Sequence, residues 1–211
     1  MHIERVDDLL SVTASGPEHA QAIAAHLVDS GHWSEVVAGI DSVVVRFDAA
    51  SVDGAVAKSQ IAESLSGELE PVTRSGDVVE IPVVYGGEYG PDLEGLCRDL
   101  GLSKNEFIEL HAGREYCVDM VGFTPGFAFV GGLDERLRVP RREEPRQHVE
   151  AGSIGIADGR TGMYAVASPG GWNIVGRTPY RLFDARAADA FPIRAGMRVR
   201  YKAIPSAEFD T

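Results

Sequence analysis

Glycine recurs through residues 121–178 in a way that limits what this chain can fold into. The segment holds eleven glycines, mixed with phenylalanine, tryptophan and arginine rather than with serine. Such glycines mark tight turns, or places where the backbone approaches another group closely. The aromatic side chains can offset the entropy cost of ordering the chain, which a flexible linker cannot do. We therefore expect a folded, turn-rich region and look for the functional site within it.

Short β-type runs alternate with turn residues from Glu115 onward. They cover residues 116–121, 128–130, 153–157, 163–166, 172–175, 180–183 and 197–203. Seven short strands at this spacing, with little helix between them, predict a barrel or a sandwich. The second half of the chain is thus expected to be an all-β domain.

Two short helices are predicted ahead of these strands. Asp92 is placed to cap the first helix, which Gly101 ends. Ser103 and Glu106 form a capping box at the start of the second, which ends near His111. The negative end of a helix dipole favours a protonated imidazole. A lone helical histidine is usually structural, and only its position beside the glycine-rich segment makes His111 a candidate functional residue.

The first half of the chain has the pattern of a repeated α/β unit. Ser15 and Ser51 are expected to cap its two helices, and a polar loop precedes its last strand. The expected strands cover residues 9–14, 33–37, 42–47 and 78–84. The order β-α-β-β-α-β is the split βαβ arrangement of ferredoxin-like modules. We predict an α+β protein with two domains, 1–84 and 85–211, the first a scaffold or docking surface.

Charge and composition exclude several classes of partner. The net charge of −12 argues against nucleic acid or an anionic membrane surface, because phosphate binding needs clustered basic residues. Two cysteines, Cys97 and Cys117, are too few for a disulfide framework and are expected to be buried, reduced thiols. No signal-type N-terminus and no apolar run of about 20 residues occurs, so a cytoplasmic protein is expected.

Five arginines between residues 136 and 146 form a local basic patch on this acidic chain. Within it, Arg141, Arg142 and Arg146 stand between two prolines or directly after them. A solvated loop with internal Arg–Glu pairs, each worth about 0–1 kcal/mol, is one interpretation. A clamp for a carboxylate or phosphate is the other, because guanidinium offers a planar bidentate fork. The prolines and the neighbouring glycine turns favour the clamp, and His148 lies close enough in sequence to join it.

Residues 171–178, GWNIVGRT, differ from a Walker A phosphate loop at one position. That loop needs a following helix, whose amides hold the phosphates. Here Pro179 pushes Thr178 towards extended geometry, and Arg177 replaces the phosphate-reaching lysine. We therefore predict a β-hairpin turn and no P-loop.

Spacing alone names no reaction. The sequence holds no G-x-S-x-G elbow, no HExxH and no metal-type cluster of histidine and cysteine. Asp119, Asp134 and Asp158 are available as general acids or bases, but no pattern selects one of them. The residues predict a basic, glycine-shaped pocket in a β domain, without a metal.

Several motifs nevertheless resemble one family in dense succession. They are IPVVYGG with GPDL at 81–93, ELHAG at 109–113, VGFTPGFAFVGGL at 121–133, PRREEPR at 140–146, AGSIGIADGRTGMY at 151–164 and SPGGWNIVGRTP at 168–179. They are similar to the allophanate hydrolase subunit 1 family, which includes the B component of bacterial 5-oxoprolinase and the sporulation histidine kinase inhibitor. The same domain forms half of the carboxyltransferase module of urea carboxylase.

The resemblance implies a ferredoxin-like N-terminal domain and a cyclophilin-like β-barrel at the C-terminus. It implies a partner of the subunit 2 type (the C component of 5-oxoprolinase) and a third protein, the A component. It also implies ATP, which would be held by this chain, by the partner or at their interface. The implied reaction is the ATP-driven opening of 5-oxo-L-proline to L-glutamate by a complex whose components do little alone. Arg141 and Arg146 would stabilise charge, and His111 or His148 would carry a proton. The residues expected to bind substrate are Phe123, Pro125, Phe127, Arg142, Arg160, Thr161, Gly170, Gly171 and Trp172.

This chain departs from the family pattern at three places. Glu150 stands where the family has proline, Arg160 where it has glutamine, and Ala165 where it has proline. These changes bear on the substrate more than on the fold. Three functions therefore stay open: a 5-oxoprolinase subunit, a subunit of an allophanate hydrolase or urea carboxylase system, and a non-enzymatic inhibitor of a histidine kinase. A prolyl isomerase activity would rest on fold likeness alone.

Overall fold

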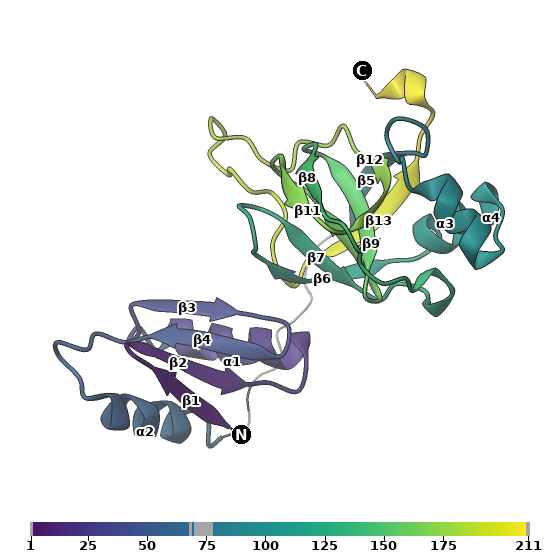
Figure 1. Ribbon diagram of the computed structural model, residues 1–211. Helices are drawn as coiled ribbons and strands as arrows, with labels where there is room; N and C mark the ends of the chain where they lie inside the picture. The colour runs from purple at the N-terminus through teal and green to yellow at the C-terminus, as the bar shows by residue number, and fades with distance from the viewer. Residues whose placement is uncertain (1, 68, 70–77, 210–211) are drawn as a thin grey trace. The chain divides into compact units, whose positions relative to one another are not determined.

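A computed structural model shows two compact units, Met1–Arg74 and Ser75–Thr211 (Figure 1). The structure describes residues 2–67, 69 and 78–209. Most of the polar stretch expected to be a loop before residue 78 lies outside these residues. No helix in the described part of the chain is both long and apolar enough to cross a membrane.

The first unit is a four-stranded antiparallel sheet with two helices. The strands lie in the order β1-β2-β4-β3. The elements are β1 (Ile3–Val6), β2 (Leu9–Thr13), α1 (Pro17–Asp29), β3 (Glu35–Ala38), β4 (Ser42–Arg46) and α2 (Gly54–Ser64). Alternate residues of the two central strands, such as Leu10 and Val45, are fully buried together with Ile23 of α1 and Ile61 of α2. The period of two in the strands and of 3.6 in the helices places these side chains in one core.

The helix starts of this unit lie slightly beyond the predicted caps. Gly16, not Ser15, precedes α1, with Pro17 in its first turn. Asp53, not Ser51, caps α2, and its carboxylate accepts a hydrogen bond from the Ala55 amide at 2.8 Å. Ser51 instead donates to Asp48. An aspartate directly before the helix competes better for the cap than a serine two residues earlier.

The predicted ferredoxin-like arrangement is not confirmed, because its closing strand lies elsewhere. The strand expected at 78–84 is β5 (Val79–Tyr85), which pairs within the second unit. The place beside β2 is taken by β1, which the sequence patterns did not predict. The division between units accordingly falls at residues 74–75 rather than at 84–85.

The second unit contains a closed barrel of seven strands, in the order β10-β7-β6-β13-β5-β12-β9. This agrees with the cyclophilin-like barrel that the family resemblance implied. Besides β5, the barrel strands are β6 (Tyr116–Val121), β7 (Ala128–Gly131), β9 (Ser153–Ala157), β10 (Arg160–Met163), β12 (Asn173–Arg177) and β13 (Arg198–Ala203). Strands β5 and β13 are parallel, with Ile81 opposite Tyr201, and the other neighbouring barrel strands are antiparallel.

Smaller elements cover the barrel. They are α3 (Leu93–Leu100), α4 (Lys104–Ala112), the two-stranded sheet of β8 (Arg146–Val149) and β11 (Ser168–Gly170), and the 3-10 turns η1 (Glu135–Leu137) and η2 (Ser206–Glu208). The predicted capping box of α4 is confirmed, since Ser103 and Glu106 bond reciprocally. Every residue of β9 is buried. A strand covered on both faces is expected to be continuously apolar or small, as SIGIA is.

Some sequence predictions for the barrel need correction. Residues 180–183 do not form a strand, and the strand expected at 163–166 begins earlier, at Arg160. By contrast, the rejection of a P-loop is confirmed, because residues 173–177 are strand β12 and no helix follows them directly. The hairpin turn predicted for this segment is wrong, because β12 runs through it and pairs with β5 and β9. Cys97 is buried, as expected, whereas Cys117 is only half-buried.

Candidate functional site

Three arginines of the basic patch pair with carboxylates of the same chain. Arg146 forms a bidentate pair with Asp92, with both N–O distances at 2.8 Å, and Arg142 Nη1 donates to the same carboxylate at 2.9 Å. The backbone amide of Ile174 donates to Asp92 Oδ2 at 2.6 Å. Asp92 therefore joins the start of α3 to β8, β12 and the loop before β8. It occupies the predicted N-cap position but makes no capping hydrogen bond, because its oxygens face these donors instead.

The other two basic candidates of this region are exposed. Arg141 Nε donates to Asp158 at 2.9 Å, and His148 Nε2 lies 3.1 Å from Glu150. Both pairs are solvated on each side, so each contributes about 0–1 kcal/mol. Three arginines that are close in sequence thus do not converge on one external ligand. Two of the arginines predicted to bind an external anion, Arg142 and Arg146, bind Asp92 instead.

Five of the predicted binding residues belong to a covered aromatic layer. Phe127 and Trp172 are buried, with ring centroids 5.5 Å apart in a T-shaped arrangement, and Tyr164 packs on Phe127. A Cβ at Gly162 would lie 2.9 Å from both Phe127 and Trp172, so this glycine lets the rings rest on β10. The arginine-bearing loop continues over this layer, since the Arg142 amide donates to the Gly171 carbonyl and Gly170 pairs with Arg146. The layer that covers the barrel at this place therefore contains five predicted binding residues: Phe127, Trp172, Gly170, Gly171 and Arg142.

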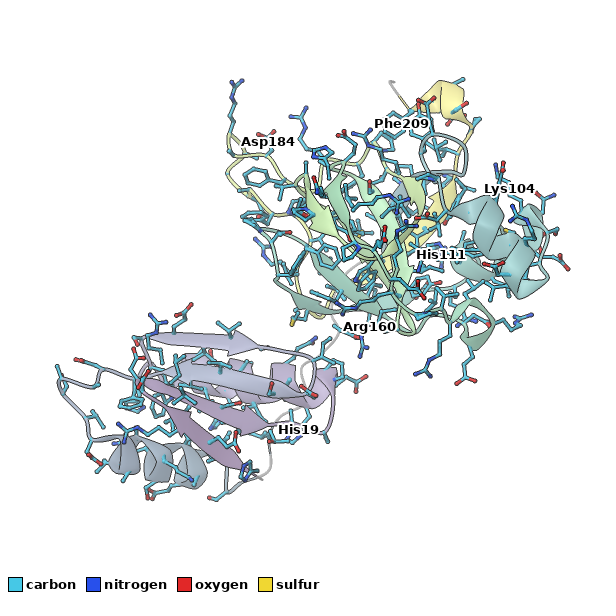
Figure 2. All side chains as sticks on the ribbon, in the orientation of Figure 1. His19, Lys104, His111, Arg160, Asp184 and Phe209 are labelled. Carbon is cyan, nitrogen blue, oxygen red and sulfur yellow. The ribbon has the colours of Figure 1, made fainter. Side chains whose placement is uncertain are left out.

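His111 is fully buried in the barrel unit, between α4 and three strands (Figure 2). The Tyr85 hydroxyl lies 2.6 Å from Nδ1, and Thr161 Oγ1 lies 2.9 Å from Nε2. Thr161 in turn donates to the Tyr201 hydroxyl at 3.3 Å. These contacts are consistent with a neutral imidazole, which accepts a hydrogen bond from Tyr85 at Nδ1 and donates one to Thr161 at Nε2. We call these four residues the His111 hub.

Burial sets the protonation state of this hub. Loss of hydration lowers the pKa of His111 to about 3, and it raises the pKa of the Tyr85 and Tyr201 hydroxyls. The expectation that the α4 dipole favours a protonated His111 is therefore wrong. A dipole effect of at most about 2 kcal/mol at a helix end is smaller than the cost of burying an unpaired charge.

Arg160 lies at the start of β10, at the rim of the barrel (Figure 2). Its Nε donates to Asp119 Oδ2 at 3.2 Å, and both side chains are largely buried. Thr161, its neighbour, points the other way into the His111 hub. The two residues predicted together as substrate contacts thus lie on opposite faces of one strand.

The remaining two predicted residues, Phe123 and Pro125, line an open cavity of about 630 Å³. Its walls are residues 121–126, between β6 and β7, and residues 189–191 and 193–195. Phe123 is 69% exposed and has a φ of 73°, a left-handed conformation that non-glycine residues rarely adopt. An exposed aromatic ring held in a strained conformation is typical of binding loops. We call this space the loop cavity.

Polar groups of the loop cavity have spare bonding capacity. Thr124 Oγ1 is buried and has no hydrogen-bond partner in the described part of the chain. Arg194 donates to Asp189 at 2.8 Å, but both side chains are at least half exposed. Such a pair is weak and exchangeable. Gly126 keeps the loop against the far wall, since a Cβ there would lie 2.6 Å from Phe191.

Sequence reasoning missed several residues that matter here. Asp92 was predicted only as a helix cap, Tyr201 only as a strand residue, and Tyr85 only as part of the hinge that follows the strand at 78–84. Arg194 and Asp189 lie in a stretch without regular secondary structure. A signal was available for Asp92 alone: it is the acidic residue of GPDL that follows a glycine turn. The others are brought together by barrel closure, which no local pattern encodes.

Comparison with known proteins places the chain in a family. The model of the carboxyltransferase domain, subdomain C and D, matches residues 10–193. The B subunit of 5-oxoprolinase from Escherichia coli O157:H7 is 40% identical over 192 residues, which are 90% of this chain and 87% of that protein. The B subunit of 5-oxoprolinase from Bacillus subtilis (strain 168) is 41% identical over 152 residues, or 72% and 63% of the two chains.

Solved structures share the fold. TTHA0988 aligns with 97% of this chain at a TM-score of 0.82 and 28% identity, and this chain spans 41% of it. The urea carboxylase of Kluyveromyces lactis aligns with 99% of this chain at a TM-score of 0.76, and 22% of that enzyme is covered. Its identity of 16% shows the fold alone. Because the family model and the E. coli relative each cover most of this sequence, the chain belongs to the family of the carboxyltransferase domain, subdomain C and D.

Proposed function

We propose that this chain is one component of an ATP-dependent hydrolase complex that opens 5-oxo-L-proline to L-glutamate. The observation that carries the proposal is the 40% identity to the B subunit of a 5-oxoprolinase across 90% of this chain. The aligned residues are 90% of this chain, so the similarity extends into both units. In this reaction ATP hydrolysis drives the addition of water across the lactam C–N bond.

The loop cavity has the chemistry that 5-oxoproline requires. The substrate carries one carboxylate, one lactam amide and an apolar ring edge. Arg194 offers a guanidinium fork for the carboxylate, provided that it exchanges Asp189 for the ligand. The Thr124 hydroxyl is enclosed and unpaired, so a rotation of this side chain towards the cavity would let it donate to the lactam, and leaving such a group unpaired costs about 1–3 kcal/mol. Phe123 and Phe191 supply the apolar walls.

The arginine clamp receives a different role in this proposal. Arg142 and Arg146 are committed to Asp92, so they hold the barrel wall rather than the substrate. Removing them would act through the positions of β12 and the aromatic layer. His111 is likewise a structural group, because it is buried, neutral and fully hydrogen-bonded. His148 and Arg141 stay available on the surface for contact with a partner.

We do not propose an ATP site formed by this chain alone. A triphosphate needs several converging amides and cations. The segment closest to a phosphate loop is strand β12, and Arg141, Arg142 and Arg146 are paired with carboxylates. We therefore propose that ATP is held by the partner protein or at the interface with it. The proposed partners are the proteins that correspond to the C and A components of 5-oxoprolinase.

Reconstitution tests this function directly. The chain is co-expressed with the proteins that correspond to the C and A components, and ATP-dependent release of glutamate from 5-oxo-L-proline is measured. Arg194→Met and Thr124→Val are expected to raise KM, the first by about tenfold or more, because a charged hydrogen bond is worth about 1.5–3 kcal/mol. Arg186→Met is the matched control, since this exposed arginine lies in the same segment but outside the cavity.

The possible results separate the alternatives. Turnover of urea or allophanate in place of 5-oxo-L-proline would contradict the proposed substrate. Inhibition of a histidine kinase without any turnover would contradict the enzyme role. Normal glutamate release with an unchanged KM in both cavity variants would remove the loop cavity from the proposal and leave the complex in place.

A further inference from the structure

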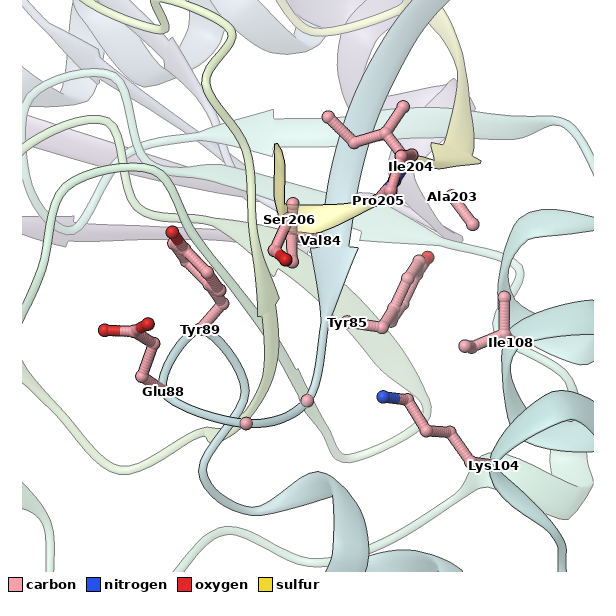
Figure 3. Close-up of a pocket in the computed structure, with 12 residues that line it drawn as sticks. Val84, Tyr85, Glu88, Tyr89, Lys104, Ile108, Ala203, Ile204, Pro205 and Ser206 are labelled. Carbon is pink, nitrogen blue, oxygen red and sulfur yellow. The ribbon is translucent and has the colours of Figure 1, made fainter. Parts of the chain in front are cut away.

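A second cavity lies on the barrel unit, and none of the site residues predicted from sequence is among the residues that line it (Figure 3). Its volume is about 380 Å³. Its walls come from the turn after β5, from the first turns of α4 and from the segment after β13. The lining residues include Gly86, Gly87, Glu88, Lys104, Ile108 and Ser206. We call this space the lysine pocket.

Lys104 occupies an electrostatically unfavourable position. It is the first residue of α4, where the positive end of the helix dipole opposes a cation. The chain has only three lysines. Lys202 pairs with Glu80 at 3.5 Å, whereas Lys104 makes no ion pair within the described ranges 2–67, 69 and 78–209. An unpaired ammonium at a helix start, facing a cavity, is the arrangement that an anionic ligand would stabilise.

The turn opposite Lys104 is built from two left-handed glycines. Gly86 has a φ of 73° and Gly87 a φ of 57°. A Cβ at Gly86 would lie 3.1 Å from Lys104 Nζ, so the glycine lets the ammonium approach the turn. Figure 3 shows the Lys104 amine directed at this turn. The amides of Gly87 and Glu88 donate to no acceptor in the part of the chain that the structure describes.

The remaining polar groups of the lysine pocket favour a phosphate group over a carboxylate as the ligand. Ser206 adds a hydroxyl to the lining, and the Tyr85 hydroxyl is already committed to His111. The Glu88 carboxylate points away from Lys104 in Figure 3. Amides of a glycine turn together with one lysine and one hydroxyl suit a single phosphate group. A planar carboxylate is more often met by an arginine fork, which this pocket lacks.

We propose that the lysine pocket binds one phosphate group, either as inorganic phosphate or at the end of a small phosphorylated molecule. Lys104 Nζ supplies the charge, and the amides of the glycine turn and the Ser206 hydroxyl supply the hydrogen bonds. The pocket offers one cation, so a nucleoside triphosphate is not its ligand. Inorganic phosphate is a product of the proposed reaction, but binding here needs neither ATP nor a partner.

Lysine acetylation footprinting tests the site, with internal controls in the same molecule. The purified chain is treated with an acetylating reagent, with and without inorganic phosphate at constant ionic strength, and each lysine is followed by mass spectrometry. At a phosphate concentration of twice Kd, acetylation of Lys104 should slow about threefold, because the free fraction falls to one third. Lys58 and Lys202 should react at unchanged rates. Equal slowing of all three lysines would overturn the proposal.

Calorimetry on variants separates the ligand sources. Inorganic phosphate, glycerol 3-phosphate, L-glutamate and 5-oxo-L-proline are titrated into the wild-type chain, Lys104→Met and Lys58→Met. Lys104→Met should weaken binding of the phosphate ligands at least tenfold without lowering the thermal transition, whereas Lys58→Met should bind like the wild type. Whichever phosphate ligand binds tighter identifies the source. No phosphate binding up to about 10 mM, ten times a millimolar Kd, would overturn the site, as would equal binding by Lys104→Met.

Discussion

The barrel unit fastens its two helices to the barrel in opposite ways. At α4, the His111 hub is neutral and fully buried, and it joins the helix to β5, β10 and β13 through hydroxyl groups. At α3, Asp92 is ionic and about one tenth exposed, and it joins the helix to β8 and β12 through two arginines and an amide. Each attachment depends on one polar residue near a helix end.

The difference shows how burial selects between the two solutions. Inside the barrel no opposite charge reaches His111, so the cost of desolvation keeps the imidazole neutral. At the rim, three donors replace the hydration that the Asp92 carboxylate loses. Helix position alone would have predicted a charged group at both places. The number of donors within reach, and not the dipole, decides the outcome.

Asp92→Ala should give the largest effect on stability. It removes the acceptor of Arg142, Arg146 and the Ile174 amide, and it leaves two partly buried arginines unpaired. We expect the free energy of unfolding to fall by about 3 kcal/mol, at the lower end for breaking a buried ion pair, since the arginines are about one quarter to one third exposed. Chemical denaturation of the isolated chain measures it.

Asp134→Ala is the matched control for Asp92. Asp134 also pairs with two arginines, Arg114 and Arg136, and its side chain is similarly buried, but it lies at the start of the short η1 turn and joins no helix to the barrel. Its loss should be clearly smaller. A similar loss in both variants would show that ion pairing as such, and not the attachment of α3, carries the effect.

A fall in pH should lower the stability that depends on the neutral form of His111. The pKa of His111 is about 3 in the folded chain and 6.5 when unfolded, so only the unfolded state takes up its proton between these values. Stability from this group is therefore complete above pH 6.5 and is lost as the pH falls towards 3. Between pH 7 and pH 5.5 the loss should be about 1.3 kcal/mol, at 1.36 kcal/mol for each pKa unit.

The variant His111→Gln isolates this term. Glutamine keeps hydrogen-bonding capacity but cannot titrate, so the variant should be less stable at pH 7 and should lose less stability than the wild type on acidification. The comparison needs denaturation curves of both proteins at the same series of pH values. Parallel pH profiles would mean that His111 is accessible to protons in the folded state.

Much of this second unit followed from local patterns. The capping box of α4, the run of short strands and the absence of a P-loop are encoded within a few residues, because caps, turns and prolines act locally. Less of the first unit could be predicted from sequence. Strand β5 has the same β-branched pattern whether it closes a sheet of the first unit or a barrel, and only its partner β13, more than a hundred residues later, distinguishes them.

The candidate sites were harder to predict for the same reason. Arg142 and Arg146 have the side chains of an anion clamp, and the structure supplies the anion from Asp92, about 50 residues away in sequence. Phe123 and Pro125, predicted to bind substrate, both line the loop cavity, and their role there stays a prediction. Thr124, between them, was passed over, since a single hydroxyl gives no signal until its burial is known.

Thr161→Val tests the contrast between the two attachments through a single neutral hydrogen bond. Valine preserves the shape but leaves His111 Nε2 without its acceptor, at a cost of about 1–2 kcal/mol. Because the hub carries no charge, the loss should be the same in low salt and at about 1 M salt, where the Debye length is only about 3 Å. Thr161→Ser should recover most of the stability by restoring the hydroxyl. A salt-dependent loss in Thr161→Val would place a charge in the hub and would contradict a neutral His111.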